Sequence, residues 1–487
     1  MKRLSLALPL CLMLGACAVG PDYAGPSLSL PAKWGNAPAS KRPLASRTLD
    51  EWWKRLGDKT LNSIVEEAVA GNLDVASAKA RIREARATRR QAVGALFPSL
   101  DGTDSATRSR TSAATSSTGG NATSSLYKAG FDASWELDLF GANYRGVEAA
   151  TYGADAAEED LRATLLTLVG DVTSNYVEAR GYQARIALAR RTAASQRETE
   201  GLTRTKFQAG SASAVDVAKA AAQASSTEAA IPSLEAAYAQ SLHQLGILTG
   251  QAPTALAGRL ARGGPIPAAR STPPAGLPAD VLRNRPDVRK AERQLAQYTA
   301  KIGQAEAALY PSVSLTGSIA TSALKTGDLA KNASIGWSFG PTLSVPIFNG
   351  GELRAAVEVA QAQRDQYDSA FKLSVLTAMQ DVENALVSLA QERLRAGKLS
   401  SAATSYRDAA RLSRTLYQSG SSSFLDVLDA ERSLYSAEDT LLQSRVAVST
   451  DFIALNKALG GSWSKPVDVS SPAVVDVNTG PHPRTGF

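Results

Sequence analysis

The stretch FQAGSASAVDV, residues 207–217, returns 210 positions later as YQSGSSSFLDV, residues 417–427. Further matches keep the same order and nearly the same spacing, which a chance recurrence would not do. They are Leu73-Asp74-Val75 with Pro286-Asp287-Val288, Leu96–Leu100 with Leu309–Val313, and Leu245–Gly250 with Leu455–Gly460. The chain is therefore two copies of one unit, roughly residues 73–250 and 286–460.

Each copy contains a very long stretch without proline, Gly141–Gln208 in the first and Gly351–Gln418 in the second. If helical, about 67 residues would extend roughly 100 Å. Apolar residues recur in steps of three and four, or of seven, at Val375, Ala378, Val382, Ala385 and Leu389, and at Val427, Leu434, Leu441, Val448 and Leu455. Such steps predict one apolar seam on each helix and coiled-coil packing, although an ordinary helical bundle would share them.

Between the helices of each copy lies a segment in which apolar and polar residues alternate. Segments of about ten residues with this alternation are typical of transmembrane β-barrel strands, and a half-buried hairpin of a soluble protein is the alternative. The apolar positions are Phe131, Ala133, Trp135, Leu137 and Leu139 in the first copy, and Val313, Leu315, Ile319, Ile335, Trp337, Phe339, Leu343, Val345 and Ile347 in the second. The strand after Leu100 is the weakest, because Asp104 falls on its apolar face.

The expected strands also bear on assembly. Two hairpins give one chain four strands, which cannot close a barrel, and open sheet edges do not occur in lipid. We therefore predict an oligomer. Three chains of four strands would supply twelve, enough to leave a water-filled lumen.

The N-terminus is typical of a secretory signal, because two basic residues precede a short apolar run, Leu4–Leu14. The run is too short to span a bilayer as a mature helix. Cys17 follows Leu14-Gly15-Ala16, which resembles the lipobox of bacterial lipoproteins, where the signal is cleaved before an acylated cysteine. This resemblance predicts a covalent lipid on Cys17 and no remaining free thiol, and Ala18 is compatible with the outer membrane. A plain secretory signal is the alternative.

Composition argues against several classes of function. The 487 residues include 53 Lys and Arg against 46 Asp and Glu, with no basic stripe among aromatic residues, so nucleic-acid binding is not expected. The only histidines are His243 and His482, which disfavours metal sites and histidine catalysis. The sequence has no nucleophile elbow, zinc-protease, phosphate-loop or dinucleotide motif, so we expect neither an enzyme nor a cofactor.

The lipobox, the duplicated helix–β-hairpin–helix unit and the helix length together resemble the TolC-like outer membrane factors, within them the lipoprotein efflux branch of the OprM/NodT type. The resemblance covers Trp52 to Gly461, and its most specific part is the repeated Phe/Tyr-x-x-Gly-x-x-Ser-x-x-Asp-Val turn. It implies a mainly α fold with a transmembrane β-barrel portion: a homotrimer with a 12-stranded β-barrel in the outer membrane, on a long α-helical barrel in the periplasm. It further implies a passive, gated exit duct for small molecules in a tripartite efflux system. The implied partners are a periplasmic membrane fusion (adaptor) protein and an inner-membrane pump of the RND type.

The resemblance assigns the two turns to the periplasmic end, where the tunnel closes and the adaptor docks. Leu425 matches a constriction ring, and Asp426 and Asp429 match acidic rings, which would favour cations. Tyr417 and Asp216 match positions that link the two repeats when the tip is closed. Helix N-capping is the plainer reading of the aspartates.

One position departs from the family. Ser422 stands where the best-studied channel has an arginine, so that ion pair is missing and closure must rest on other contacts. Gly210 and Gly420 are expected to permit a positive φ. With Ser213 and Ser423 they are candidate docking residues for the adaptor, although serine beside glycine is also ordinary turn chemistry.

We expect six segments: a signal peptide (1–16), an N-terminal extended segment (17–60), repeat 1 (61–262), a linker (263–278), repeat 2 (279–461) and a C-terminal tail (462–487). Two other functions remain open. A periplasmic coiled-coil adaptor or structural lipoprotein would share the long helices but lack the aromatic faces with Trp135 and Trp337. An exit duct for type I protein secretion is disfavoured by the lipoprotein resemblance alone.

Overall fold

The computed structural model describes residues 18–26, 31–35, 49–114, 122–269, 278, 283–461, 463–472 and 474. The expected signal peptide, Cys17 and most of the C-terminal tail lie outside these residues. The elements are η2 (Trp52–Leu56), α2 (Lys59–Gly71), α3 (Leu73–Gly94), β1 (Ser99–Thr111), β2 (Ala122–Leu137), α4 (Ala142–Gln208), α5 (Ala214–Leu248), α6 (Ala257–Leu260), α8 (Pro286–Ala307), β3 (Ser312–Ala323), η3 (Thr326–Asp328), η4 (Asn332–Ser334), β4 (Ile335–Ser344), α9 (Glu352–Gln418) and α10 (Phe424–Ala458).

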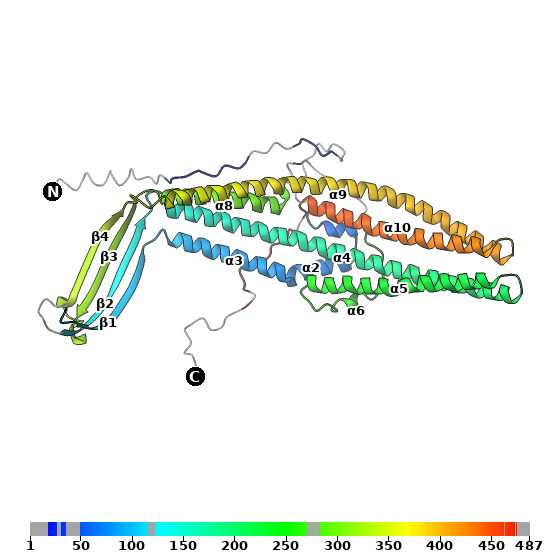
Figure 1. Ribbon diagram of the computed structural model, residues 1–487, viewed down its shortest axis with the longest axis horizontal. Helices are drawn as coiled ribbons and strands as arrows, with labels where there is room; N and C mark the ends of the chain where they lie inside the picture. The colour runs from blue at the N-terminus through cyan, green and yellow to red at the C-terminus, as the bar shows by residue number, and fades with distance from the viewer. Residues whose placement is uncertain are drawn as a thin grey trace. The chain divides into compact units, whose positions relative to one another are not determined.

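The duplication predicted from the sequence is present in the fold (Figure 1). Helices α4 and α9 have 67 residues each, and α5 and α10 have 35 each. The two long helices begin directly after Gly141 and Gly351, both of which have positive φ. Glycine adopts such a backbone at little steric cost, which marks where the strand segment ends and the helix begins.

Packing divides the chain into two compact units that do not coincide with the repeats. Unit 1 contains residues 1–27, 82–157 and 290–372, and unit 2 contains residues 28–81, 158–289 and 373–487. Each unit therefore draws on both copies of the repeat.

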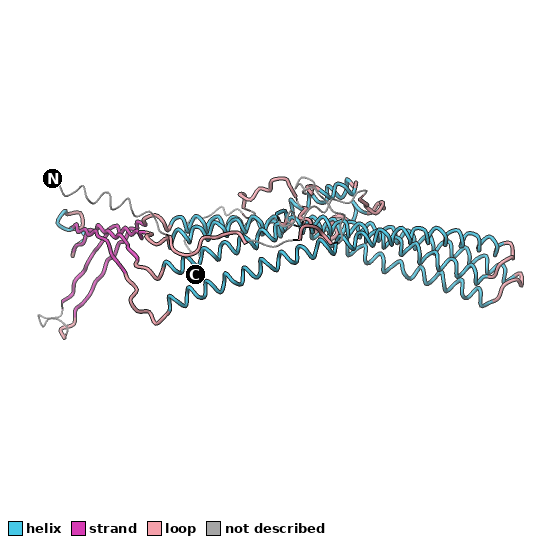
Figure 2. The backbone as a smooth tube through the Cα atoms, turned by 90° about the horizontal axis from the view of Figure 1, so that it is seen from above, coloured by secondary structure: helices cyan, strands magenta, loops and turns pink. Residues whose placement is uncertain are grey.

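Unit 1 contains an antiparallel sheet which, within the described residues, has four strands in the order β1-β2-β3-β4 (Figure 2, magenta). Residues directly opposite one another share a face of the sheet. The register places Phe131 opposite Ile319 and Ile319 opposite Trp337. It also places Leu100 opposite Ala133. The alternation read from the sequence thus adds up to one continuous apolar face across all four strands.

That apolar face is largely uncovered in the single chain. Trp337 and Phe339 expose 78% and 70% of their surface. On the opposite face, Asp101 lies directly across from Asp132. Asp104 lies opposite Ala129 on the apolar face, as expected for the weakest strand. Since β1 and β4 are both edge strands, the sheet of one chain is open on both sides.

Residues 19–22 of unit 1 lie against α4 and α8. The buried guanidinium of Arg145 donates to the Val19 carbonyl at 3.1 Å and to the Asp22 carboxylate at 2.8 Å. Gly20 approaches Gly303 of α8 so closely that a Cβ on Gly20 would stand 2.3 Å from the Gly303 Cα. Only glycine permits this approach.

Unit 2 contains the hairpin of α5 with α4 from residue 158 onward, and that of α10 with α9 from residue 373 onward. The turns of the two hairpins lie beside each other in both views (Figures 1 and 2). At the other end of unit 2, Trp52 packs edge-on against Trp53 and Phe452, and its indole N–H donates to the Gly461 carbonyl. Among the described helices, none combines the length and apolarity needed to cross a membrane.

Candidate functional site

The two hairpin turns have the same backbone construction. After α4, the N–H of Gly210 donates to the Phe207 carbonyl at 2.9 Å; after α9, that of Gly420 donates to the Tyr417 carbonyl at 3.1 Å. Gly210 has φ 75° and Gly420 has φ 81°. A Cβ would meet nothing within 4 Å at either glycine, so the backbone angle, not lack of space, requires glycine there.

A capping box begins the helix after each turn. Ser213 Oγ accepts from the Asp216 N–H at 3.1 Å, and the Asp216 carboxylate accepts from the Ser213 N–H at 3.1 Å. Ser423 and Asp426 repeat this arrangement at the start of α10. The two aspartates thus satisfy backbone donors that a helix N-terminus leaves free.

Asp426 has an additional donor. The Ser422 hydroxyl bonds its carboxylate at 2.8 Å, and this bond together with those from Ser423 lowers the pKa of Asp426 below its ordinary value. Ser422, which stands in place of the family's arginine, therefore belongs to the cap of α10. A gate role for Asp426 stays a prediction, beside a structural role that the geometry supplies.

Leu425 and Asp429 are both exposed in the single chain. Leu425 exposes 61% of its surface, and Asp429 is also exposed. Asp429 lines a hollow of about 720 Å³ between α5, α9 and α10, together with Thr227 of α5 and Tyr406 of α9. Their spacing of four residues places Leu425 and Asp429 on one side of the helix. Both side chains are thus exposed on the same side of α10.

Tyr417 joins the two repeats, but not through Asp216. Its ring is buried with Ala220, Phe424 and Val427. Its hydroxyl donates to Thr203 Oγ1 in α4 at 3.3 Å, and Lys206 Nζ lies 4.9 Å from the ring centroid. The Asp216 carboxylate is held in its own capping box instead.

The structure contains a second link between the repeats, which the sequence analysis did not predict. Glu431 of α10 is only 7% exposed and accepts from Thr199 Oγ1 of α4 at 2.9 Å. Arg414 of α9 forms an ion pair with Glu431 and also bonds Ser195 Oγ of α4. We call Ser195, Thr199, Arg414 and Glu431 the inter-repeat clamp.

The sequence does carry a signal for this clamp. Stepping by four and three from Val427 reaches Glu431, Leu434 and then Glu438, so two carboxylates occupy positions of an apolar seam. A charge on a seam needs a partner, because burial of an unpaired ion is costly. Here the partners are Arg414 for Glu431 and Arg407 for Glu438, both on α9.

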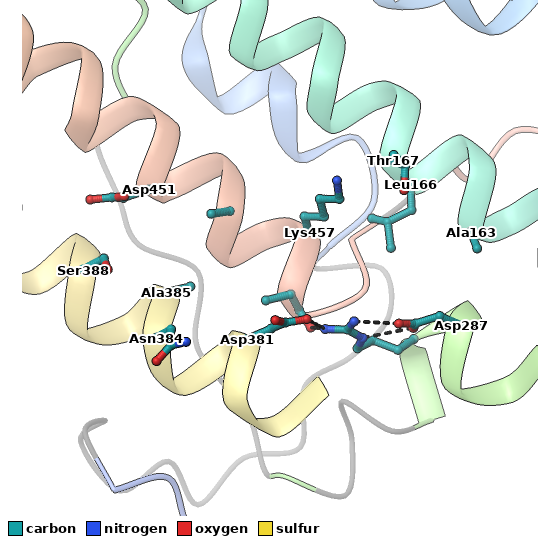
Figure 3. Close-up of a pocket in the computed structure, with 13 residues that line it drawn as sticks. Ala163, Leu166, Thr167, Asp287, Asp381, Asn384, Ala385, Ser388, Asp451 and Lys457 are labelled. Atoms are coloured by element: carbon teal, nitrogen blue, oxygen red, sulfur yellow. Dashed lines mark hydrogen bonds and ion pairs between the residues drawn. The ribbon is translucent and has the colours of Figure 1, made fainter. Parts of the chain in front are cut away.

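A cavity of about 490 Å³ that contains a charged cluster lies elsewhere in unit 2, between α4, the start of α8, α9 and α10 (Figure 3). Arg285 pairs there with Asp287 at 2.6 Å and with Asp381 at 2.9 Å, and it also bonds the Ala458 carbonyl. Burial raises the pKa of Asp451, and the charge of Glu392 adds to the effect. Because Asp287 and Asp381 are committed to Arg285, this cluster braces the helices. In the described part of the chain, no group of three or more His, Cys, Asp or Glu side chains is placed to hold a metal ion.

Paired helical hairpins ending in matched turns, in one chain with antiparallel strands that expose an apolar face, define a membrane-inserted channel protein. The sequence profile of the outer membrane efflux protein family matches residues 64–251 and 277–461. The chain belongs to this family. It is an outer membrane efflux channel whose helices extend into the periplasm, and channels of this type are homotrimers that work with an adaptor and an inner-membrane pump.

Similar proteins are found over nearly the whole chain. Nodulation protein T of Rhizobium leguminosarum bv. trifolii is 37% identical, with 93% of this chain and 96% of that protein covered. The toluene efflux pump outer membrane protein TtgI of Pseudomonas putida is 34% identical, with 95% and 99% covered. The solved outer-membrane channel OprN has a TM-score of 0.86 and 34% identity, with 92% of this chain and 100% of that chain covered.

The open-state structure of the Neisseria gonorrhoeae MtrE outer membrane channel has a TM-score of 0.79 and 30% identity, with 91% and 98% covered. These comparisons confirm the family, the fold class and the efflux function expected from the sequence. They set aside the reading as a periplasmic adaptor or structural lipoprotein.

Proposed function

We propose that the turn end of unit 2 is the gated periplasmic mouth of the channel and that the inter-repeat clamp helps to hold it closed. The observation that carries this is the bonding of Glu431 and Arg414, both in the second repeat, to Thr199 and Ser195 in the first. A gate that opens by moving one helical hairpin past the other would have to break these bonds. The buried Tyr417–Thr203 contact adds a second tie closer to the turns.

The clamp accounts for closure despite Ser422. The family's arginine would supply an ion pair at the tip, and this chain lacks it. Here Arg414 and Glu431 form an ion pair between α9 and α10, and both side chains also bond α4 of the first repeat, with the glutamate side chain only 8% exposed. A pair at this depth is weakly screened by salt, so it can hold helices that an exposed pair could not.

The chain performs no chemistry of its own in this proposal and needs no cofactor; it passes cargo from an inner-membrane pump of the RND type through a periplasmic adaptor. Gly210, Ser213, Gly420 and Ser423 lie at the turns where the adaptor would dock. Relatives are named for the efflux of toluene and for the export of pyoverdine, which favours small molecules over secreted proteins as cargo. Planar-bilayer conductance tests the gate: the wild-type trimer should carry a small, cation-selective current, and a large one would contradict it.

The apolar face of the sheet should tolerate charge far less than the polar face. Trp337→Arg places a cation in the row formed with Phe131 and Ile319, where lipid would surround it. A charge at the middle of a barrel's lipid face costs about 2–4 kcal/mol. We expect a marked loss of assembled trimer in isolated outer membranes. Ser338→Arg, on the opposite face of the same strand, is the matched control and should assemble normally; equal loss in both variants would contradict the assignment of the faces.

Cys17, which lies outside the described residues, should carry a covalent lipid. Cys17→Ser removes the acylated thiol, while the strands and helices that form the channel remain. We therefore expect loss of the lipid and retention of the barrel in the membrane. Mass spectrometry of the mature N-terminus measures this, and an unmodified Cys17 in the wild-type protein would contradict the lipobox assignment.

A further inference from the structure

A groove beside the clamp holds an unusual set of polar groups. It encloses about 360 Å³ between α4, α9 and α10, and four of its lining residues are Arg191, Arg407, Arg411 and Arg414. The three arginines of α9 follow one another at four and three residues, so they share one face of that helix. Arg191 reaches the groove from α4.

The carboxylates of the groove neutralise only part of this charge. Glu431 pairs with Arg414, and Glu438 pairs with Arg407. In the part of the chain that the structure describes, the only ion pair of Arg411 is with Asp408 on its own helix, at 3.4 Å. Both side chains are more than 60% exposed, so this pair contributes little. Within the described residues, Arg191 has no acidic partner. Two guanidinium groups of the groove are therefore available to an anion.

Gln196 lines the same groove and is left without hydrogen bonds. Gln196 is only 2% exposed, and neither its Nε2 nor its Oε1 has a hydrogen-bond partner in the described structure. The Nε of Arg414 is also buried and unbonded. Buried polar atoms are ordinarily paired, so these three atoms beside one groove leave hydrogen-bonding capacity that the described residues do not satisfy. Guanidinium and amide N–H groups donate, and the amide oxygen accepts.

We propose that this groove binds a small multivalent oxyanion of the phosphate type. Its oxygens would accept from Arg191, Arg411 and the unbonded donors of Gln196 and Arg414, because guanidinium groups match the geometry of phosphate oxygens. Hydrogen phosphate also carries an O–H that can donate to Gln196 Oε1. Such a ligand contacts α4 and α9 at once, so it ties the two repeats together next to the clamp. The site goes beyond the proposed gate, since binding does not depend on conduction.

The experiment is thermal unfolding of the purified, detergent-solubilised trimer in increasing phosphate, with chloride replacing phosphate at constant ionic strength. A ligand that binds the folded state alone raises the midpoint in a saturable way. We expect this rise in the wild type and an apparent affinity about tenfold or more weaker after Arg191→Gln with Arg411→Gln. Arg395→Gln is the control, because Arg395 lies on α9 outside the groove and pairs with Glu392 on its own helix.

The variant Gln196→Met provides a second, independent test. It removes two unbonded buried atoms, so the variant without phosphate should unfold at a higher temperature than the wild type. The same change removes a donor, so its response to phosphate should weaken. A phosphate response that is unsaturable, or equal in the wild type and the arginine double variant, would overturn the proposal, as would a wild type that does not respond. The conductance of Arg414 variants tests the gate, whereas the thermal unfolding in phosphate tests anion binding. Each proposal can therefore fail without the other.

Discussion

Replacing Arg414 by methionine should raise the single-channel conductance of the purified trimer. Methionine keeps much of the aliphatic volume but leaves the Glu431 side chain, 8% exposed, with Thr199 as its remaining partner in the clamp. Breaking a buried ion pair by removing one partner costs about 3–5 kcal/mol. The loss also frees α9 from Ser195 of α4. Both effects disfavour the closed arrangement of the hairpins, so planar-bilayer recordings should show larger and longer openings.

Arg407→Met is the matched control for this prediction. Arg407 lies on the same helix and pairs with Glu438 of α10, so its pair connects two helices of the second repeat only. Its loss should leave conductance near the wild-type value. If both variants raise conductance equally, general loosening of the bundle explains the result better than a specific clamp. If Arg414→Met conducts like the wild type while assembling normally, the clamp does not hold the gate.

Glu431→Gln separates charge from hydrogen bonding in the clamp. The amide oxygen can still accept from Thr199, while the ion pair with Arg414 is gone. We expect a conductance between the wild type and Arg414→Met, because the neutral side chain carries no unpaired buried charge. The order of the three conductances, with Glu431→Gln between the wild type and Arg414→Met, thus tests whether the effect of Arg414→Met on the gate is electrostatic.

The strands and long helices of this fold could be predicted because they follow from the local periodicity of apolar residues in the sequence. Alternation placed Phe131, Ile319 and Trp337 on one face, and the pairing register then aligned them in a single row. Proline-free stretches bounded by Gly141 and Gly351 marked both long helices to within one residue. In each case neighbouring residues in the sequence carry the information, so no knowledge of the tertiary packing was needed.

The clamp and the exact partner of Tyr417 could not be predicted in that way. Glu431 lies 232 residues from Thr199, and nothing local selects one hydroxyl among many. Tyr417 meets Thr203, because Asp216 is drawn into the Ser-x-x-Asp capping box, which needs no distant contact. The sequence showed that Glu431 sits on an apolar seam, but only the packed helices show which arginine reaches it.

Replacing Leu425 and Asp429 together by alanine should raise conductance severalfold and reduce the preference for cations. Both side chains are exposed on one side of α10, and neither is needed to hold its own chain together. In a homotrimer, the same positions recur three times around the mouth. A ring of leucines narrows a pore, and a ring of carboxylates attracts cations and repels anions. Recordings under an ion gradient measure both the conductance and the selectivity.

Single substitutions then distinguish the contributions of Leu425, Asp426 and Asp429 to the gate. Asp429→Asn should mainly reduce cation selectivity, because it removes charge with little change in size, whereas Leu425→Ala should mainly raise conductance. Asp426→Asn is the informative comparison: its carboxylate caps α10 through Ser422 and Ser423, so its effect should include loss of helix stability. If the double variant conducts like the wild type while Arg414→Met opens the channel, closure depends on the clamp and not on the rings. If all of these variants leave a small current unchanged, the constriction lies elsewhere in the channel, because neither side-chain rings nor inter-repeat bonds at the turns would then limit the flow of ions.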